Sequence, residues 1–179
     1  MVTKADVRVS VSAARRAMFG DERATARAAI CSVVAARLDE SPLPDGATVA
    51  AYEPLGTEPG SLDLLRLLAE RASRLIVPLT LPDRDLDWTV WGSPAPLGVE
   101  AIGTAALILV PAFAVDGRGG RLGRGGGSYD RALARAAHDA EIAALLFPGE
   151  VLTEVPTDPW DRPVTSVITP DGWQRCRDL

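Results

Sequence analysis

Histidine and lysine are almost absent from this sequence. His138 is the single histidine among 179 residues, which argues against a Ser-His-Asp triad and against a zinc site built from histidines. Lys4 is the single lysine, and the rest of the 19 basic residues are arginines. A lysine kept at one position offers a compact ammonium that can reach a phosphate as a point charge. The alternative is an ordinary solvated lysine near the N-terminus.

Three further features of the composition argue against a disulfide-rich, a membrane-bound or a nucleic-acid-binding protein. Cys31 and Cys176 do not form the pattern of a disulfide framework, which favours a reduced, cytoplasmic setting. No stretch of 18 apolar residues occurs, and the first residues show no secretory segment, so we expect no membrane association. The net charge of −5 argues against nucleic acid as a partner.

Apolar periodicity and turn residues divide the chain into alternating helices and strands. Helical spacing predicts helices over residues 3–18, 21–38 and 61–72 and one beginning near Tyr129. Thr3 and Ser61 are the expected N-caps. Apolar runs predict strands over residues 47–52, 74–79, 86–91, 105–115, 141–147 and 164–169, the last of these being the final strand. Residues 93–104 and 151–163 are expected to be irregular.

Strands that alternate with helices imply βαβ units and a mostly parallel sheet covered by helices on both faces. We therefore predict an α/β fold with a three-layer α/β/α arrangement. Residues 1–179 are expected to form a single domain, because no linker, repeat or low-complexity segment divides the chain. In such sheets, ligands bind where the strands end and the chain enters the following helix.

The segment "DGRGGRLGRGGGSYD", residues 116–130, follows a long apolar strand and leads into a predicted helix. Glycines let the backbone approach an anion closely and adopt positive φ, so that successive N–H groups can surround a phosphate. Arg121 and Arg124 can add charge-assisted hydrogen bonds, and Ser128 can cap the helix or contact the anion. The segment lacks the ending of a Walker A loop and the spacing of a dinucleotide fingerprint. A flexible surface loop is the alternative interpretation.

A carboxylate next to this loop suggests a metal. Asp130 would repel a bound phosphate unless a magnesium ion lay between them, and magnesium is usually held by one or two carboxylates and phosphate oxygens. Asp158 and Asp161 are candidates for the second carboxylate, although the helix dipole alone would also favour Asp130. Lys4 and Arg8 lie four residues apart on one predicted helical face, where an anion between them would offset their repulsion.

With these motifs the chain resembles the 5-formyltetrahydrofolate cyclo-ligase family, also called methenyltetrahydrofolate synthetases. The family's strand and glycine-loop signature is similar to "VPAFAVDGRGGRLGRGGGSYDRAL", residues 110–133. Its weaker motifs are similar to "KADVR" at 4–8, "YEPLGTE" at 52–58 and "DRPVTSVI" at 161–168, in the same order along the chain. The resemblance implies the fold of the NagB/RpiA/CoA-transferase-like proteins.

The resemblance also implies an enzyme that closes the ring of 5-formyltetrahydrofolate to give 5,10-methenyltetrahydrofolate, using ATP with Mg2+ and releasing ADP and phosphate. In the family's scheme, the formyl oxygen attacks the γ-phosphate, and N10 of the folate then closes the ring and expels phosphate. Such a reaction needs positioning and charge stabilisation and no protein nucleophile. The implied partners are therefore ATP and 5-formyltetrahydrofolate, bound by a monomer or weak homodimer.

The resemblance assigns roles to individual positions. The ATP-binding residues it implies are Lys4, Arg8, Arg121, Leu122, Gly123, Arg124, Gly125, Gly126, Gly127, Ser128 and Tyr129. The folate-binding residues it implies are Glu53, Glu58, Arg124, Gly125, Gly126, Gly127 and Ser128. Asp130 and Asp161 match the family's magnesium ligands, whereas Asp158 does not. Arg124 and Lys4 are the implied catalytic residues.

Two departures from the family pattern leave other functions open. Ser128 stands where the family usually has the first tyrosine of Y-Y-D, and the family's G-x-P-E-P stretch survives only as "GVEAI" at 98–102. A tryptophan at 88, 91 or 160 could replace the lost ring, although tryptophan is more commonly a core residue. One alternative is a catalytically weak nucleotide- or folate-binding relative of the same fold. Another is an isomerase or transferase that works without ATP, for which Lys4 and His138 are poorly placed.

Overall fold

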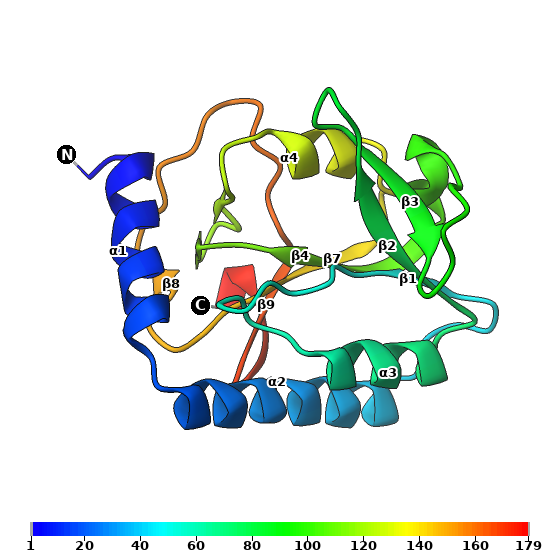
Figure 1. Ribbon diagram of the computed structural model, residues 1–179, viewed down its shortest axis with the longest axis horizontal. Coiled ribbons are helices and arrows are strands. Elements are labelled where there is room, and N and C mark those ends of the chain that lie inside the picture. Colours follow the sequence, from blue (N-terminus) through cyan, green and yellow to red (C-terminus); the bar gives the residue numbers. More distant parts are fainter. Residues whose placement is uncertain (1, 179) are drawn as a thin grey trace.

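The centre of the structure is a seven-stranded sheet between two layers of helices (Figure 1). The computed structural model describes residues 2–178. The order of the strands is β10-β9-β7-β4-β1-β2-β3, with bounds Gly172–Arg175, Ser166–Thr169, Glu141–Leu145, Ala105–Pro111, Thr48–Ala50, Arg74–Thr80 and Leu86–Val90. The five inner strands run parallel, and β3 and β10 pair antiparallel at the two edges.

Helices cover both faces of this sheet. One face carries α2 and α3, and the other carries α4 and the 3-10 helix η1, with bounds Gly20–Glu40, Leu62–Arg71, Ser128–Leu133 and Val99–Thr104. Because successive strand residues point to opposite faces, Leu107 packs with α2 and α3, whereas Ile108 packs with α4 and η1. The expected three-layer α/β/α fold with a mostly parallel sheet is confirmed. No helix within residues 2–178 has the length and apolar character needed to cross a membrane.

A second, three-stranded sheet and helix α1 (Lys4–Ala17) lie beyond the end of β4. The strand order is β6-β5-β8, with bounds Arg121–Leu122, Ala114–Asp116 and Val151–Leu152. Val7 and Val11 of α1 pack against Ala114 and Leu122 in a small core of their own. Figure 1 shows α1 next to β8 at one end of the molecule. This arrangement brings the N-terminal helix to the edge where parallel sheets bind ligands.

The helix starts predicted from the sequence are confirmed. Thr3 caps α1 in a capping box with Asp6, and the Ser61 hydroxyl accepts a hydrogen bond of 3.1 Å from Leu64 N at the start of α3. The second predicted helix lies within α2. These starts are predictable because a cap uses residues that are close together in the sequence.

The single strand predicted over 105–115 is wrong. β4 ends in the main sheet, and after a break of two residues β5 begins in the second sheet. The chain turns there because Ala112 O accepts a hydrogen bond from Arg15 Nη2 and Phe113 N donates to Leu122 O. Neither backbone group is then free to continue the ladder of the main sheet. The apolar pattern does not reveal the break, since both halves are buried.

The helix predicted from Tyr129 is shorter than its sequence pattern indicates. α4 has only six residues, because Arg135 N and Ala136 N bond to carbonyls three residues back and tighten the chain into turns. Its N-cap is Gly127 in the left-handed conformation, so the prediction that Ser128 caps the helix is wrong. A helix this short contributes only a small dipole. The positive charge near its start therefore comes mainly from the arginines of the loop.

Several short elements were not predicted. β6 and β8 lie in segments without a strand pattern, and η1 lies within the segment 93–104, which was expected to be irregular. β9 lies within the strand at 164–169 that was expected to be the last, but β10 follows it and pairs with it in a hairpin, and a further 3-10 helix, η2, spans Cys176–Asp178. The turn pattern "TPDG" at residues 169–172 is the signal that could have revealed this hairpin. The two-residue strands depend on tertiary pairing and leave no local signal.

An ion pair between the turn after α4 and the turn before β3 predicts a pH dependence of stability. Arg135 donates two hydrogen bonds to Asp85, of 2.9 and 2.6 Å, and lowers the pKa of Asp85 to about 2. A carboxyl with a depressed folded pKa stabilises the protein above its ordinary pKa, and this contribution is lost as the pH falls toward 2. We expect Asp85→Asn to lower the Tm near neutral pH by a few degrees and to weaken its decline below roughly pH 4. Thermal unfolding from neutral to acidic pH measures both effects, and parallel curves for the two proteins would contradict the prediction.

Candidate active site

A cavity of about 640 Å³ lies at the carboxyl ends of β1, β2 and β4. Its wall combines α1, the loops that follow β1 and β4, and the segment 158–161. Every residue that the sequence predicted to bind ATP, folate or magnesium lines this one cavity: Lys4, Arg8, Glu53, Glu58, Arg121, Leu122, Gly123, Arg124, Gly125, Gly126, Gly127, Ser128, Tyr129, Asp130 and Asp161. The fold thus gathers positions that are up to 157 residues apart in the sequence.

Lys4 and Arg8 reach the cavity from successive turns of α1. Lys4 Nζ donates to Asp158 Oδ2 at 2.6 Å and to Asp161 Oδ2 at 2.5 Å, and Arg8 Nε donates to Gly123 O at 2.8 Å. Burial by itself would lower the pKa of Lys4, but the two carboxylates outweigh it and raise that pKa. The Lys4 ammonium therefore stays charged, and each cation is held at the cavity wall by a protein partner.

Two glycines of the loop leave room for arginine side chains. A Cβ at Gly123 would lie 2.7 Å from Arg121 Nη1, and a Cβ at Gly125 would lie 3.2 Å from Arg8 Nη2. Gly125 also has a φ of +92°, which residues with a side chain rarely adopt. These glycines therefore do more than expose the backbone to an anion, because they let two guanidinium groups pack against the loop.

Arg121 and Tyr129 carry buried polar atoms without a partner. Arg121 Nη2 donates to Asp130 Oδ1 at 2.7 Å, while Arg121 Nε has no hydrogen-bond partner in the described part of the chain. The Tyr129 hydroxyl also lacks a partner among residues 2–178, and burial raises the pKa of Tyr129. Buried polar atoms in proteins are nearly always hydrogen-bonded. These two atoms belong to residues that line the cavity, whereas the other two such atoms among residues 2–178, Arg23 Nε and Trp88 Nε1, belong to residues that do not.

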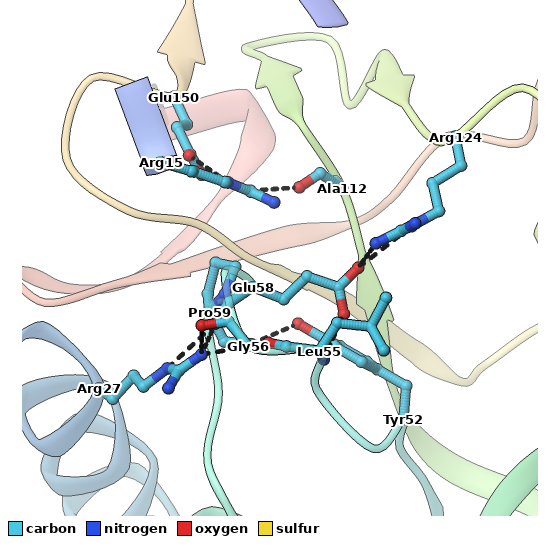
Figure 2. Close-up of polar contacts among 10 residues, drawn as sticks. All are labelled: Arg15, Arg27, Tyr52, Leu55, Gly56, Glu58, Pro59, Ala112, Arg124 and Glu150. Carbon is cyan, nitrogen blue, oxygen red and sulfur yellow. Dashed lines mark hydrogen bonds and ion pairs between the residues drawn. The ribbon is translucent and has the colours of Figure 1, made fainter. Parts of the chain in front are cut away.

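Glu58 and Arg124 form an ion pair in the cavity wall (Figure 2). The Glu58 side chain is 8% exposed, and its Oε1 accepts a hydrogen bond from Arg124 Nη2 at 2.9 Å. Its Oε2 accepts from Leu55 N at 2.9 Å, so both carboxylate oxygens are fixed. Glu53 is exposed and accepts from Trp91 Nε1 at 3.2 Å. Glu58 is therefore the better-ordered of the two glutamates that the sequence predicted.

The two carboxylates expected to bind magnesium lie close to backbone donors as well as to their ion-pair partners. Asp130 accepts a hydrogen bond from Arg162 N at 3.0 Å, and Asp161 accepts one from Asp158 N at 2.7 Å. Residues 2–178 contain no group of three or more His, Cys, Asp or Glu side chains that could hold a metal. Magnesium commonly binds to one or two carboxylates and to substrate phosphates, so these two carboxylates could hold it only together with a phosphate, and here each is paired with a cation.

The sequence analysis missed Arg15, which lines the cavity wall. Asp158, a candidate carboxylate, and Trp160, a candidate aromatic surface, also line it, and Trp160 has 70% of its surface exposed. The expectation of a core tryptophan is right for Trp88, which is fully buried, and wrong for Trp160. Arg15 falls four residues after Val11 on the buried face of α1, and this spacing is the signal that could have identified it.

Arg15 joins α1 to the strand ends through a buried ion pair (Figure 2). Its Nε and Nη2 donate to the two carboxylate oxygens of Glu150 at 2.7 Å each, and Nη2 also donates to Ala112 O at 2.7 Å. The guanidinium lies 5.2 Å from the ring of Phe113 and 5.8 Å from that of Phe147, within the range of cation–π contacts. These contacts fix the helix that carries the first two cations of the cavity.

Comparisons with known proteins agree with this geometry. The model of the 5-formyltetrahydrofolate cyclo-ligase family matches residues 1–170. A 5-formyltetrahydrofolate cyclo-ligase from Mycolicibacterium smegmatis is 42% identical over 144 residues, which cover 70% of this chain and 74% of that relative. The solved structure of a 5,10-methenyltetrahydrofolate synthetase from Mycoplasma pneumoniae matches with a TM-score of 0.81 at 20% identity, covering 94% of this chain and 99% of that one. The corresponding synthetase from Aquifex aeolicus matches with a TM-score of 0.76 at 26% identity, covering 99% of this chain and 95% of that one.

Proposed function

Because this chain belongs to the 5-formyltetrahydrofolate cyclo-ligase family, a family of enzymes, we propose that it closes the ring of 5-formyltetrahydrofolate. The product is 5,10-methenyltetrahydrofolate, and the reaction consumes ATP with magnesium and releases ADP and phosphate. The observation that carries this proposal is the convergence of the family's separate motifs on one cavity, from Lys4 to Asp161. The proposal keeps the expectations of a cytoplasmic location, of a monomer or weak homodimer, and of one domain over residues 1–179, of which 1 and 179 lie outside the described residues.

The ATP phosphates are assigned to Lys4, Arg8, Arg121 and the glycine loop. An ammonium contacts phosphate as a point charge, and a guanidinium can bind two phosphate oxygens at once. The loop adds backbone N–H groups from residues without side chains, which an anion can approach closely. Support comes from the cavity wall, which Lys4, Arg8 and Arg121 share with the glycine loop.

Magnesium is assigned to Asp130 and Asp161. Five basic and five acidic side chains line the cavity, so a polyphosphate would meet carboxylates as well as cations. When bound, magnesium neutralises charge on the phosphate oxygens and reduces the repulsion that an attacking oxygen meets. Magnesium held there would compete with Arg121 for Asp130 and with Lys4 for Asp161, while Lys4 would keep its second partner, Asp158.

The folate is assigned to the glutamates and to residues 124–128 of the glycine loop. Glu58 is the main pterin contact in this proposal, because its carboxylate is buried and ordered and can accept charge-assisted hydrogen bonds from ring N–H groups. Glu53 lies on the same loop and completes the predicted pair. Ser128 stands where the family usually has a tyrosine, so that aromatic ring is absent from this loop. The exposed ring of Trp160 in the cavity wall offers an aromatic surface instead.

In this proposal the chain's residues position the substrates and stabilise charge. The formyl oxygen attacks the γ-phosphorus, a new P–O bond forms, and the bond to ADP breaks. N10 then attacks the formyl carbon and loses its proton, while the C–O bond to phosphate breaks and phosphate leaves. Lys4 and Arg124 are assigned to stabilise the negative charge of the transferred phosphate. No side chain forms a covalent bond to either substrate.

A direct assay tests the proposal. Mixing the protein with magnesium, ATP and 5-formyltetrahydrofolate should produce the absorbance of the methenyl product, with one ADP released for each ring closed. Absence of product at micromolar protein concentration would overturn the enzyme proposal. Binding of ATP or of the folate without turnover would then support the alternative of a catalytically weak relative, for which Ser128 is the specific observation.

Substitution of a proposed magnesium ligand provides a second test. Asp130→Asn removes the charge that attracts the ion but keeps the size of the side chain, so we expect the magnesium concentration at half-maximal rate to rise about ten-fold. Magnesium titrations at saturating ATP and folate measure this value. Asp139→Asn is the matched control, because Asp139 is exposed and does not line the cavity among the described residues. An unchanged titration for Asp130→Asn would reject the ligand role.

A further inference from the structure

The loop that carries Glu58 has little regular hydrogen bonding of its own. Residues 51–61 connect β1 to α3 and form neither helix nor strand. Within this loop, Glu58 N donates to Leu55 O at 2.9 Å, and the Tyr52 hydroxyl donates to Pro59 O at 2.8 Å. The carbonyl oxygens of Leu55, Gly56 and Glu58 also accept hydrogen bonds from a donor outside the loop, and the contact at Glu58 O is part-buried.

Arg27 of α2 is that donor (Figure 2). Its Nε donates to Glu58 O at 3.1 Å, and its Nη2 donates to the carbonyl oxygens of Glu58, Leu55 and Gly56 at 2.6, 3.2 and 3.1 Å. The two hydrogens of Nη2 are shared among the three carbonyls and Nε adds a second contact to Glu58 O, so one planar guanidinium holds three points of the loop. In Figure 2, Arg27 approaches the loop from the helix, while the Glu58 side chain extends away from it toward Arg124.

We propose that Arg27 is a positioning residue for folate binding, because it fixes the backbone from which the Glu58 carboxylate extends into the cavity. This inference rests on the proposed function, which assigns that carboxylate to the pterin. Arg27 is not among the described residues that line the cavity, so it acts through Glu58 and not by touching the substrate. Arg27 also donates a hydrogen bond to Leu55 O. Because Leu55 N in turn donates to Glu58 Oε2, Arg27 orders the Glu58 side chain as well as the loop backbone.

The effect of Arg27 should be larger for the folate than for ATP. Three of the cations assigned to ATP are held by contacts outside the 51–61 loop: Lys4 by Asp158 and Asp161, Arg8 by the backbone of the glycine loop, and Arg121 by Asp130. The fourth, Arg124, pairs with Glu58 itself. Loss of Arg27 should therefore displace Glu58 and leave the contacts of Lys4, Arg8 and Arg121 in place.

The kinetic test compares Arg27→Ala and Arg27→Lys with the unaltered protein. Arg27→Ala should raise the KM for 5-formyltetrahydrofolate about ten-fold, because a misplaced contact costs binding, and should change the KM for ATP by less than about two-fold. Arg27→Lys should recover only part of the loss, because one ammonium cannot reach three carbonyls at fixed angles. Arg37→Ala is the matched control, since Arg37 is also half-buried on α2 but packs on Trp173, at 5.6 Å.

Hydrogen–deuterium exchange supplies a readout that does not depend on activity. The amides of Leu55 and Glu58 should exchange faster in Arg27→Ala than in the unaltered protein and in Arg37→Ala. Unchanged exchange would overturn the positioning role. Faster exchange with an unchanged folate KM would overturn its link to binding, as would an equal rise in both KM values. If the unaltered protein forms no methenyl product, the proposed function fails, and exchange together with equilibrium binding of 5-formyltetrahydrofolate still decides the role of Arg27.

Discussion

Replacement of Arg15 by methionine is expected to lower the free energy of unfolding by about 3 to 5 kcal/mol, because removing one member of a buried ion pair leaves the other uncompensated. The Arg15 side chain is 4% exposed, and three hydrogen bonds join it to Glu150 and Ala112. Chemical denaturation of the variant measures the loss. Arg16→Met is the matched control, because Arg16 is the adjacent residue of α1 and is exposed.

The destabilisation should depend on pH in a defined direction. Burial already raises the pKa of Glu150, although Arg15 opposes that rise. Without Arg15 the pKa of Glu150 should rise further, and a carboxyl with a raised folded pKa loses stability as the pH increases through that value. Arg15→Met should therefore be destabilised more near pH 8 than near pH 5, and the further change Glu150→Leu should restore part of the stability. Equal unfolding curves for Arg15→Met and the unaltered protein would contradict this account.

Replacement of Arg124 by alanine is expected to reduce kcat/KM by about 10²- to 10³-fold, which is the usual cost of removing a preorganised donor from a developing charge. Arg124 belongs to the glycine loop, lines the cavity and holds one oxygen of Glu58 at 2.9 Å. Its loss should therefore affect both the transferred phosphate and the folate contact. Steady-state kinetics with each substrate varied in turn measures the effect.

The Tm of Arg124→Ala and the activity of Arg124→Lys distinguish a catalytic role of Arg124 from a structural role. Arg124 is 59% exposed, so Arg124→Ala should change the Tm by no more than a few degrees. Arg124→Lys keeps the charge but loses the planar fork, and it should recover only part of the rate. Arg118→Ala is the matched control, because Arg118 is an exposed arginine of the same 116–130 segment but is not in the described cavity wall. Activity of Arg124→Ala within a few-fold of the unaltered protein would reject the assignment.

Local features of the fold were predictable from the sequence. Thr3 and Ser61 cap their helices because each cap involves residues three positions apart. The main strands were predictable because buried β-strands need runs of apolar residues. The break in the predicted strand 105–115 was not, since it depends on the bond from Arg15 to Ala112 O, between residues 97 positions apart. The two-residue strands β6 and β8 form for the same kind of reason, by pairing with β5.

The residues of the candidate site likewise divide into those that a local sequence pattern indicates and those that only the fold reveals. The glycine loop and Asp130 lie in one continuous segment, so their pattern of residue types identifies them in the sequence. Arg27 acts on backbone carbonyls, which every residue has, and its three partners therefore leave no pattern of side chains to find. Asp158 and Trp160 are in an irregular segment, where no periodicity indicates which side chains face the cavity.

By itself the sequence determined the fold class, because hydrophobic periodicity is a local property of a chain, and its resemblance to a family, carried by compact motifs, indicated the residues expected to meet phosphate, metal and folate. Only the tertiary structure decided how the charges are paired: Lys4 with Asp161, Arg121 with Asp130, and Arg124 with Glu58. Only the structure revealed that Arg15 and Arg27 hold the helix and the loop that carry these groups. The physical reason is that ion pairs and hydrogen bonds depend on distances of a few ångströms between residues that the fold alone brings together.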